Sequence, residues 1–255
     1  MDETGTRDCK RCGGIGWVRY DVPSTDPRWG KAFPCVCKKG ELARRNQDKL
    51  REITNLTGSE LEGMTFDKFD PNKCVAPFQE NREKRIEETR IVRAQMVEVK
   101  RLCVEYAENP KGWLILQGNV GSGKTMLACA IANEQWKNNR SAHYETAPDI
   151  LSMLREGYKT DSFDERMKLL ADIDLLVLDD LGAERGTEWA EEQLYVLLNN
   201  RYRSALPLVV TTNERLESTK KIHPRIVSRL RQGTERMGGF SRVVTVPAGD
   251  LRPYV

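Results

Sequence analysis

One short glycine-rich segment constrains this chain more than any other. Residues 118–125 read GNVGSGKT and match the phosphate-loop pattern GxxxxGK(S/T). An apolar run at 113–117 precedes the glycines, and a helix-forming segment at 124–139 follows them. A buried strand that turns through glycines into a helix is the context in which this motif binds nucleotide phosphates. The segment therefore predicts an ATP site.

The residues of this loop have different predicted roles in binding the nucleotide. Small residues let successive backbone N–H groups point at the β- and γ-phosphates, near the positive end of the following helix. Lys124 adds a positive charge, and the hydroxyl of Thr125 is expected to bind Mg²⁺. The alternative is a glycine-rich turn without function, which the flanking strand and helix disfavour. The predicted nucleotide contacts are Gly118, Asn119, Val120, Gly121, Ser122, Gly123, Lys124, Thr125 and Met126.

Other apolar runs predict the sheet that carries the loop. They lie at 141–145, 173–180, 206–213 and 242–246, and helix-length segments such as 188–204 separate them. Strands that alternate with helices indicate a parallel sheet covered on both faces, so the predicted fold class is α/β. Upstream, apolar residues spaced by three and four predict an amphipathic helix that ends near residue 109. Its apolar positions are Val92, Met96, Val99, Cys103 and Tyr106.

Polar side chains follow two of the predicted strands. Asp179 and Asp180 close the run LLVLDD, and Asn213 closes VVTTN. We expect Asp179 to help hold Mg²⁺, largely through water, and Asp180 to polarise the attacking water. Asn213 is placed to orient that water. The alternative for the two acids is a solvent-facing turn after a core strand.

Two arginines lie four residues apart in the segment HPRIVSRLRQG. Arg225 and Arg229 share one face of the helix expected there. An arginine in this place can act as a finger that reaches the γ-phosphate of a neighbouring subunit. In that case the active unit is an oligomer. A surface salt bridge is the alternative.

Four of the seven cysteines cluster near the start of the chain. The spacing CxxC followed by CxC supplies four thiolates for one tetrahedral Zn²⁺. Residues 1–40 are too few to build an apolar core, so the metal is expected to be needed for folding. Redox-active thiols are the alternative, but no thioredoxin-like βαβ unit surrounds the CxxC. The predicted zinc ligands are Cys9, Cys12, Cys35 and Cys37.

The aromatic residues among these cysteines have two interpretations. Trp17, Tyr20, Trp29 and Phe33 either cover the metal site or form a docking surface for a partner.

Composition excludes several classes of protein. Hydrophobic residues make up 39% and charged residues 31% of the 255, without an apolar run long enough to cross a bilayer. The first residues carry no apolar stretch behind their charges, so we expect no secretory signal, no membrane association and a cytoplasmic location. A net charge of +3 is too small to indicate nucleic-acid binding over the whole surface. Any DNA-binding surface must be local.

The ordered motifs of the chain resemble those of one known branch of ATPases. The motifs TFDKFD, ENPKGWLILQGNVGSGKT, LLVLDDLGAE, LNNRYR, LPLVVTTN, PRIVSRL and AGDLR are similar to those of the DnaC/IstB branch of AAA+ ATPases. This branch contains bacterial and phage replicative helicase loaders. The resemblance runs from Thr65 to Arg252 and implies a P-loop AAA+ parallel sheet flanked by helices.

The same resemblance implies a role for each motif residue. Residues 118–125 correspond to Walker A, Asp179 and Asp180 to Walker B, and Asn213 to sensor 1. Arg229 corresponds to the finger that acts in trans and Arg252 to sensor 2. Most AAA+ proteins carry glutamate at the position of Asp180, although aspartate is usual in this branch. The shorter side chain is consistent with slow hydrolysis, as expected of a switch.

By this resemblance the protein is expected to load a DnaB-type replicative helicase onto single-stranded DNA during replication. ATP binding would assemble a ring or spiral of subunits, and hydrolysis would release the loader. The expected organisation is a zinc-binding module at 1–40, a helical linker at 41–63 and an AAA+ domain at 64–255. The expected DNA contacts are Arg155, Tyr158 and Lys159, whose helix face could instead simply be solvated.

Two alternative functions remain open. One is an IstB-like transposition ATPase, which binds duplex DNA and guides a transposase. The other is an adaptor in which the nucleotide only locks a conformation and no significant turnover occurs.

Overall fold

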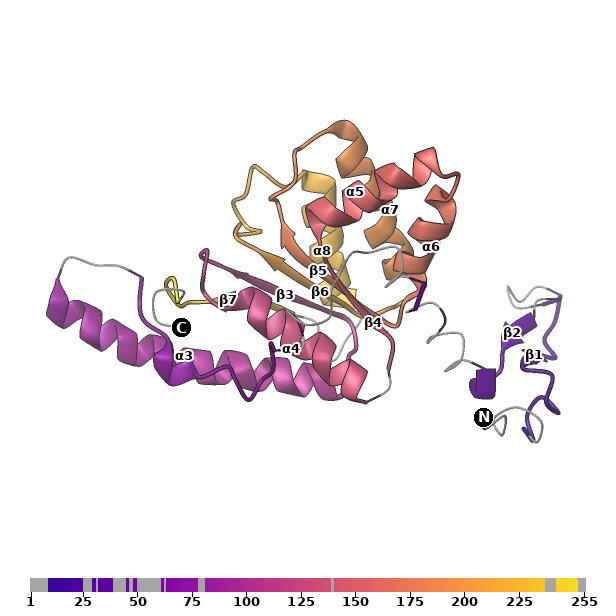
Figure 1. The fold of residues 1–255 in the computed structure, drawn as a ribbon, viewed down its shortest axis with the longest axis horizontal. Helices are drawn as coiled ribbons and strands as arrows, with labels where there is room; N and C mark the ends of the chain where they lie inside the picture. Colours follow the sequence, from indigo (N-terminus) through magenta and orange to yellow (C-terminus); the bar gives the residue numbers. More distant parts are fainter. Residues whose placement is uncertain are drawn as a thin grey trace.

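A five-stranded sheet forms the centre of the protein, in the order β4-β5-β6-β3-β7 (Figure 1). All four neighbouring strand pairs are parallel. Every strand coincides with one of the predicted apolar runs, so the predicted α/β fold class is confirmed. The strands are β3 Trp113–Gly118, β4 Ala142–Thr146, β5 Leu175–Leu181, β6 Leu208–Thr212 and β7 Arg242–Val246.

The computed structural model describes residues 9–24, 29–30, 32–38, 45, 48–49, 61, 63–77, 81–138, 140–236 and 242–251. Most of the expected helical linker at 41–63 lies outside these residues, and so does Arg252. Within the described ranges, no helix combines the length and the apolar character that crossing a bilayer requires.

Six α-helices cover the two faces of the sheet (Figure 1). Side chains of β3 alternate between the faces, because neighbouring residues of a strand point in opposite directions. Ile115 packs among the helices α5 to α8, whereas Leu114 and Leu116 pack against α3 and α4. The helices are α3 Arg82–Glu108, α4 Lys124–Lys137, α5 Ala147–Lys159, α6 Phe163–Asp172, α7 Glu188–Arg203 and α8 Pro224–Arg236.

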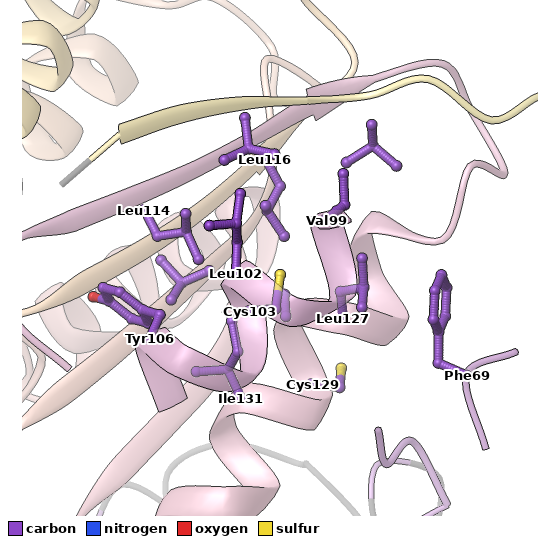
Figure 2. Packing of buried hydrophobic residues seen from close by; sticks show 14 of the residues in the cluster. Phe69, Val99, Leu102, Cys103, Tyr106, Leu114, Leu116, Leu127, Cys129 and Ile131 are labelled. Atoms are coloured by element: carbon purple, nitrogen blue, oxygen red, sulfur yellow. The ribbon is translucent and has the colours of Figure 1, made fainter. Parts of the chain in front are cut away.

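Helix α3 has the apolar face that its sequence predicts. The five apolar positions named above are all buried, and Figure 2 shows Val99, Cys103 and Tyr106 beside strand β3. The side chain of Asn81 accepts a hydrogen bond from the N–H of Lys84 and caps the helix. The helix ends before Pro110, close to the predicted position. Its N-terminal half extends past the edge of the sheet (Figure 1).

The N-terminal segment forms a separate small sheet. Strands β1 (Trp17–Arg19) and β2 (Ala32–Pro34) pair antiparallel, with Val18 opposite Phe33. A short 3-10 helix, η1 (Pro71–Lys73), lies between this region and α3 in the sequence and packs against α3.

Candidate functional site

The phosphate loop connects β3 to α4 and has a backbone that only glycine adopts readily. Gly123 caps α4 with a φ of 92°, in the left-handed region where a side chain is strained. At Gly118 a Cβ atom would lie 2.4 Å from the carbonyl oxygen of Val246 in the adjacent strand. Gly123 is therefore needed for the turn of the loop, and Gly118 is needed because β7 lies so close to it.

A pocket of about 540 Å³ opens beside this loop at the carboxyl ends of the strands. Five of the predicted catalytic and metal-binding residues meet there: Lys124, Thr125, Asp179, Asp180 and Asn213. Residues 120–126 line the pocket, whereas Gly118 and Asn119 contribute carbonyl groups behind it. This is the edge at which open parallel sheets bind ligands.

Lys124 lies at the centre of the pocket. Its ammonium group donates to the carbonyl of Asn119 at 2.6 Å, to that of Gly118 at 3.0 Å and to Oδ1 of Asn213 at 2.9 Å. Burial lowers the pKa of Lys124, and the carboxylates of Asp179 and Asp180 partly oppose this shift. The three acceptors are neutral, so the charge of the lysine is available to an anion that enters the pocket.

Asp179 is buried and held by three hydroxyl groups. Tyr144 donates to its Oδ2 at 2.6 Å, Thr125 donates to the same atom at 3.1 Å, and Thr211 donates to its Oδ1. A carboxylate beside a threonine hydroxyl is a set of hard oxygen ligands that suits Mg²⁺. The residues therefore fit the metal expected with a nucleotide. Tyr144 and Thr211 escaped the sequence analysis, although Thr211 belongs to the polar strand end VVTTN.

Asp180 adopts a backbone conformation that is unusual for a residue with a side chain. Its φ is 55°, and the pairing of β5 with β6 shifts between Leu178 and Leu181. Its N–H donates to the hydroxyl of Thr211 at 2.9 Å, and Asn213 donates to its carboxylate at 2.7 Å. Without this bulge, alternation along the strand would direct Asp180 away from the face that Asp179 occupies. The bulge instead brings both carboxylates to one pocket.

Apolar side chains form another part of the pocket lining, and two of them lie against Gly123 of the loop. Met64, Phe69 and Leu251 line this part together with Lys68 and Lys73. An apolar wall beside a phosphate loop suits the flat base of a nucleotide. The motif TFDKFD carries Phe69 and is the sequence signal for this wall.

The structure places both predicted finger candidates of α8, Arg225 and Arg229, outside this pocket. Arg225 is exposed, whereas the guanidinium of Arg229 stacks over Tyr202 at 4.5 Å and donates to the hydroxyl of Tyr195 at 3.2 Å. Neither arginine forms an ion pair with a carboxylate of the described residues. Arg229 does not line the pocket of its own chain, so any contact with the γ-phosphate requires a second chain.

The expected DNA contacts fall on an aromatic cluster at the ends of α5, α6 and α7. Tyr158 is 56% exposed and stacks on Phe163 at 4.4 Å. Trp189 donates to the hydroxyl of Tyr158 at 3.3 Å, and the guanidinium of Arg155 lies 4.7 Å from the Trp189 ring. Lys159 is instead paired with Glu156 at 2.8 Å. Phe163 and Trp189 were missed because no local sequence pattern joins them to Tyr158.

The four N-terminal cysteines form a second candidate site. All their sulfur atoms lie within 4.8 Å of one another, with Cys9 and Cys35 at 3.7 Å and Cys12 and Cys37 at 3.5 Å. Zn–S bonds of about 2.3 Å in a tetrahedron require S···S distances of about 3.8 Å. Gly16 donates its N–H to the sulfur of Cys12 at 3.2 Å. The cluster therefore fits Zn²⁺.

The local backbone favours a thiolate at Cys9, whereas burial raises the pKa of Cys37 to about 12. The N–H groups of Arg11 and Cys12 lower the pKa of Cys9 to about 6. The large side chains around the cluster remain in contact with solvent: Trp17, Tyr20 and Trp29 keep 42%, 39% and 59% of their surface exposed. Such exposure favours the docking interpretation over a covering role.

Comparison with known proteins identifies relatives of the larger, C-terminal part. The sequence model of a family described as IstB-like ATP binding protein matches residues 40–223. The replicative helicase loader DnaC of Escherichia coli K12 is 30% identical over 122 residues, which are 47% of this chain and 50% of DnaC. The replicative helicase loader DnaI of Bacillus subtilis 168 is 31% identical over 110 residues, which are 42% of this chain and 35% of DnaI.

Solved structures show the same fold at lower sequence identity. A crystal structure of the DnaC helicase loader superposes with a TM-score of 0.55 at 18% identity, covering 73% of this chain and 98% of that one. A crystal structure of DnaI gives a TM-score of 0.53 at 20% identity, covering 76% and 93%. The chain spans half or less of the length of these two curated relatives.

Proposed function

Because the chain belongs to the family of IstB-like ATP-binding proteins, we propose that it binds ATP with Mg²⁺ at the phosphate loop and hydrolyses it slowly. The observation that carries this proposal is the convergence of Lys124, Thr125, Asp179, Asp180 and Asn213 in one pocket. They come from the start of α4 and from the carboxyl ends of β5 and β6, and a structural turn would not need all of them together.

Each residue of the pocket has a role in this proposal. Lys124 exchanges its carbonyl partners for phosphate oxygens, while the amides of the glycine loop bind the remaining phosphate charge. Thr125 and Asp179 would hold Mg²⁺, which neutralises charge that develops on the phosphates. Asp180 accepts a proton from the attacking water, and Asn213 orients that water. Asp180 is already hydrogen bonded to Asn213, which is consistent with slow hydrolysis.

We further propose that the hydrolysing unit is an oligomer completed by Arg229. Stacking on Tyr202 and the hydrogen bond to Tyr195 hold this guanidinium in one orientation. A finger that is positioned in this way loses little conformational entropy when it meets a γ-phosphate. Arg252 remains an expectation for sensor 2.

The wider role proposed for the protein is the loading of a DnaB-type replicative helicase onto single-stranded DNA. Two curated relatives are named replicative helicase loaders, which supports this role. The cluster of exposed Tyr158 and half-buried Phe163 and Trp189, with Arg155, offers stacking surfaces and a cation, the chemistry that single strands require. We assign the helicase contact to the zinc module at 1–40, the linker to 41–63 and the ATPase to 64–255. A cytoplasmic location follows from this role.

The assignment of the nucleotide site is tested with two substitutions. Lys124→Ala should abolish ATP binding, measured with a fluorescent ATP analogue, because the cavity loses its central charge. Arg229→Ala should leave binding intact and remove DNA-stimulated hydrolysis. An equal loss of nucleotide binding in both variants would refute the trans-acting role of Arg229.

The helicase contact is tested by co-elution of the zinc-loaded chain with its cognate replicative helicase, in ATP and in ADP. We expect a complex in ATP that Trp17→Ala/Trp29→Ala weakens. Ile86→Ala/Val97→Ala serves as the matched control, since it removes exposed apolar side chains from α3 instead. If the aromatic and control variants bind equally well, the zinc module is not the contact.

A second function is favoured by the family description alone. An IstB-like transposition ATPase would prefer long duplex DNA to single strands and would form no complex with the helicase. A nucleotide-locked adaptor would bind ATP tightly with negligible turnover. Competition between duplex and single-stranded DNA, together with a turnover measurement, separates the three functions.

A further inference from the structure

Three consecutive polar residues lie at the carboxyl end of β6, of which only Asn213 has a role in the proposed hydrolysis. The other two, Thr211 and Thr212, are almost fully buried. A buried hydroxyl is costly unless it finds hydrogen-bond partners inside the protein. Both hydroxyls find such partners on the neighbouring strand β5, at the bulge that contains Asp179 and Asp180.

The hydroxyl of Thr211 bonds to both acidic residues at once. It donates to Oδ1 of Asp179 and accepts from the N–H of Asp180 at 2.9 Å. One oxygen atom thus orients the side chain of the first residue and the backbone of the second. A hydroxyl can form both bonds together, because it donates one proton and keeps two lone pairs. Tyr144 bonds to the first carboxylate and Asn213 to the second.

The backbone at Asp180 needs such a support. Its φ of 55° lies in the left-handed region, which residues with a side chain seldom adopt. The pairing of β5 with β6 is interrupted between Leu178 and Leu181, and an extra residue in a bulge loses its regular ladder partner. The hydroxyl of Thr211 therefore takes the place of a strand carbonyl as the acceptor for this N–H.

We propose that Thr211 is a positioning residue for hydrolysis, an inference that rests on the proposed ATPase activity. It acts through the two acidic residues. The proton that it donates orients the carboxylate of Asp179 beside the hydroxyl of Thr125, where the metal is expected. The bond that it accepts holds the backbone turn that brings the carboxylate of Asp180 into the same pocket. Thr211 thereby fixes the separation of the metal-binding group and the group that receives the proton of the attacking water.

The alternative is that Thr211 only fastens β6 to β5. Thr212 has that role, since its hydroxyl donates to the carbonyl of Leu181 at 2.7 Å and accepts from the N–H of Glu214 at 3.1 Å. Both of these partners are backbone groups. The two threonines are adjacent and equally buried. Thr212 therefore provides a matched control, in which a buried hydroxyl is lost without loss of a bond to either acidic residue.

The test measures phosphate release from ATP by the full chain at saturating Mg²⁺. Thr211→Val keeps the branched shape that suits a strand and removes the hydroxyl, and Thr211→Ala is a second variant without the hydroxyl. Both should lower kcat about 10- to 100-fold, because the two carboxylates are no longer held in place. The KM for ATP should change less than about 3-fold, since Lys124 and the glycine loop still bind the phosphates. Circular dichroism and urea unfolding verify that each variant is folded.

A second measurement needs no turnover. Mg²⁺ is titrated in the presence of a fluorescent ATP analogue, and its affinity should fall about 10-fold in Thr211→Val, because Asp179 loses one of three hydroxyl donors. Thr211→Ser retains the hydroxyl and should restore kcat and Mg²⁺ affinity to within about 3-fold of the parent. Thr212→Val should leave both values equally close to the parent and should lower the stability by a similar amount to Thr211→Val.

Equal losses of kcat in Thr211→Val and Thr212→Val would overturn the proposal, because the stability of the bulge would then control hydrolysis. Failure of Thr211→Ser to restore kcat would overturn it too, since the hydroxyl would not be responsible. A parent that binds the ATP analogue but releases no phosphate would refute the proposed hydrolysis alone. The Mg²⁺ titration would still decide the role of Thr211, and an affinity unchanged in Thr211→Val would reject it.

Discussion

Arg201, in the motif LNNRYR, is fully buried although it carries a charge. Its Nη1 donates to the carbonyls of Leu170 and Ile173 at 2.9 Å and to that of Ala171 at 3.3 Å. Its Nη2 donates to the carbonyls of Asp174 and Pro207. The guanidinium thus provides hydrogen-bond donors for the backbone carbonyls at the end of α6 and in the turn that leads into β5. Asp179 and Asp180 lie on this strand. We expect Arg201 to be structural rather than catalytic.

Arg201→Met should therefore lower the free energy of unfolding strongly. The four N–H protons of the two Nη atoms are shared among these five carbonyls. At about 1.5 kcal/mol for each of four charge-assisted hydrogen bonds, less the part returned by relief from burying a charge, the loss is about 3 to 5 kcal/mol. Each kcal/mol corresponds to about 2 to 4 °C in Tm for a domain of this size, so the melting temperature should fall by about 6 to 20 °C.

Urea unfolding followed by circular dichroism measures this loss. Arg201→Lys should lose nearly as much, because one ammonium group cannot reach carbonyls on both sides of the cage. Arg203→Met is the matched control, since Arg203 is exposed two residues further on and its loss should cost less than about 0.5 kcal/mol. A change below 1 kcal/mol in Arg201→Met would refute the reasoning.

Three further predictions concern the two sites and the buried edge strand. Tyr144→Phe removes one of three hydroxyl donors to Asp179 and should weaken the affinity for Mg²⁺ in the presence of ATP about 10- to 100-fold. Titration of Mg²⁺ in the presence of a fluorescent ATP analogue measures this affinity, and an unchanged value would contradict the role of Tyr144. Burial raises the pKa of Glu145 from 4.5 to about 7, with repulsion from Asp149 acting in the same direction, while Nε2 of His143 lies 3.8 Å from the carboxylate. The folded protein therefore binds this proton more tightly than the unfolded chain, and the stabilisation that is complete below pH 4.5 is lost as pH rises through 7. Glu145→Gln should consequently gain about 1 to 3 kcal/mol over the parent between pH 5 and pH 8 in urea unfolding, whereas a constant difference would show that Glu145 does not titrate there. Cys35→Ser should lose the zinc that the parent releases on denaturation, measured with a colorimetric chelator, and Cys103→Ser should retain it; equal zinc in both would exclude the cluster.

Much of the fold could be predicted because the signals are local. All five strands of the sheet coincide with apolar runs, since strands covered on both faces need apolar residues at nearly every position. The long helix before the phosphate loop follows from spacings of three and four, which place Val92, Met96 and Val99 on one face. The phosphate loop could be predicted as well, because its turn depends on the spacing of glycines along the chain.

Part of the site could also be predicted, because strand ends in a parallel sheet meet at one edge. Asp179 lies near the carboxyl end of β5 and Asn213 directly follows β6, and the structure brings both into one pocket with Lys124. Asp180 reaches the pocket for a different reason. Its placement depends on a bulge that appears only when β5 is paired with β6, so alternation along the strand alone gives no account of it.

The sequence by itself determined which residues form the glycine loop, which apolar runs become strands and which cysteines share one short segment, because these features depend on neighbours within a few positions. The tertiary structure alone decided the partners that come from distant elements. Tyr144 and Thr211 meet Asp179, Trp189 meets Tyr158, and the carbonyls of α6 meet Arg201 only after the helices have packed on the sheet. Such contacts depend on the register and packing of separate elements, which no local spacing encodes.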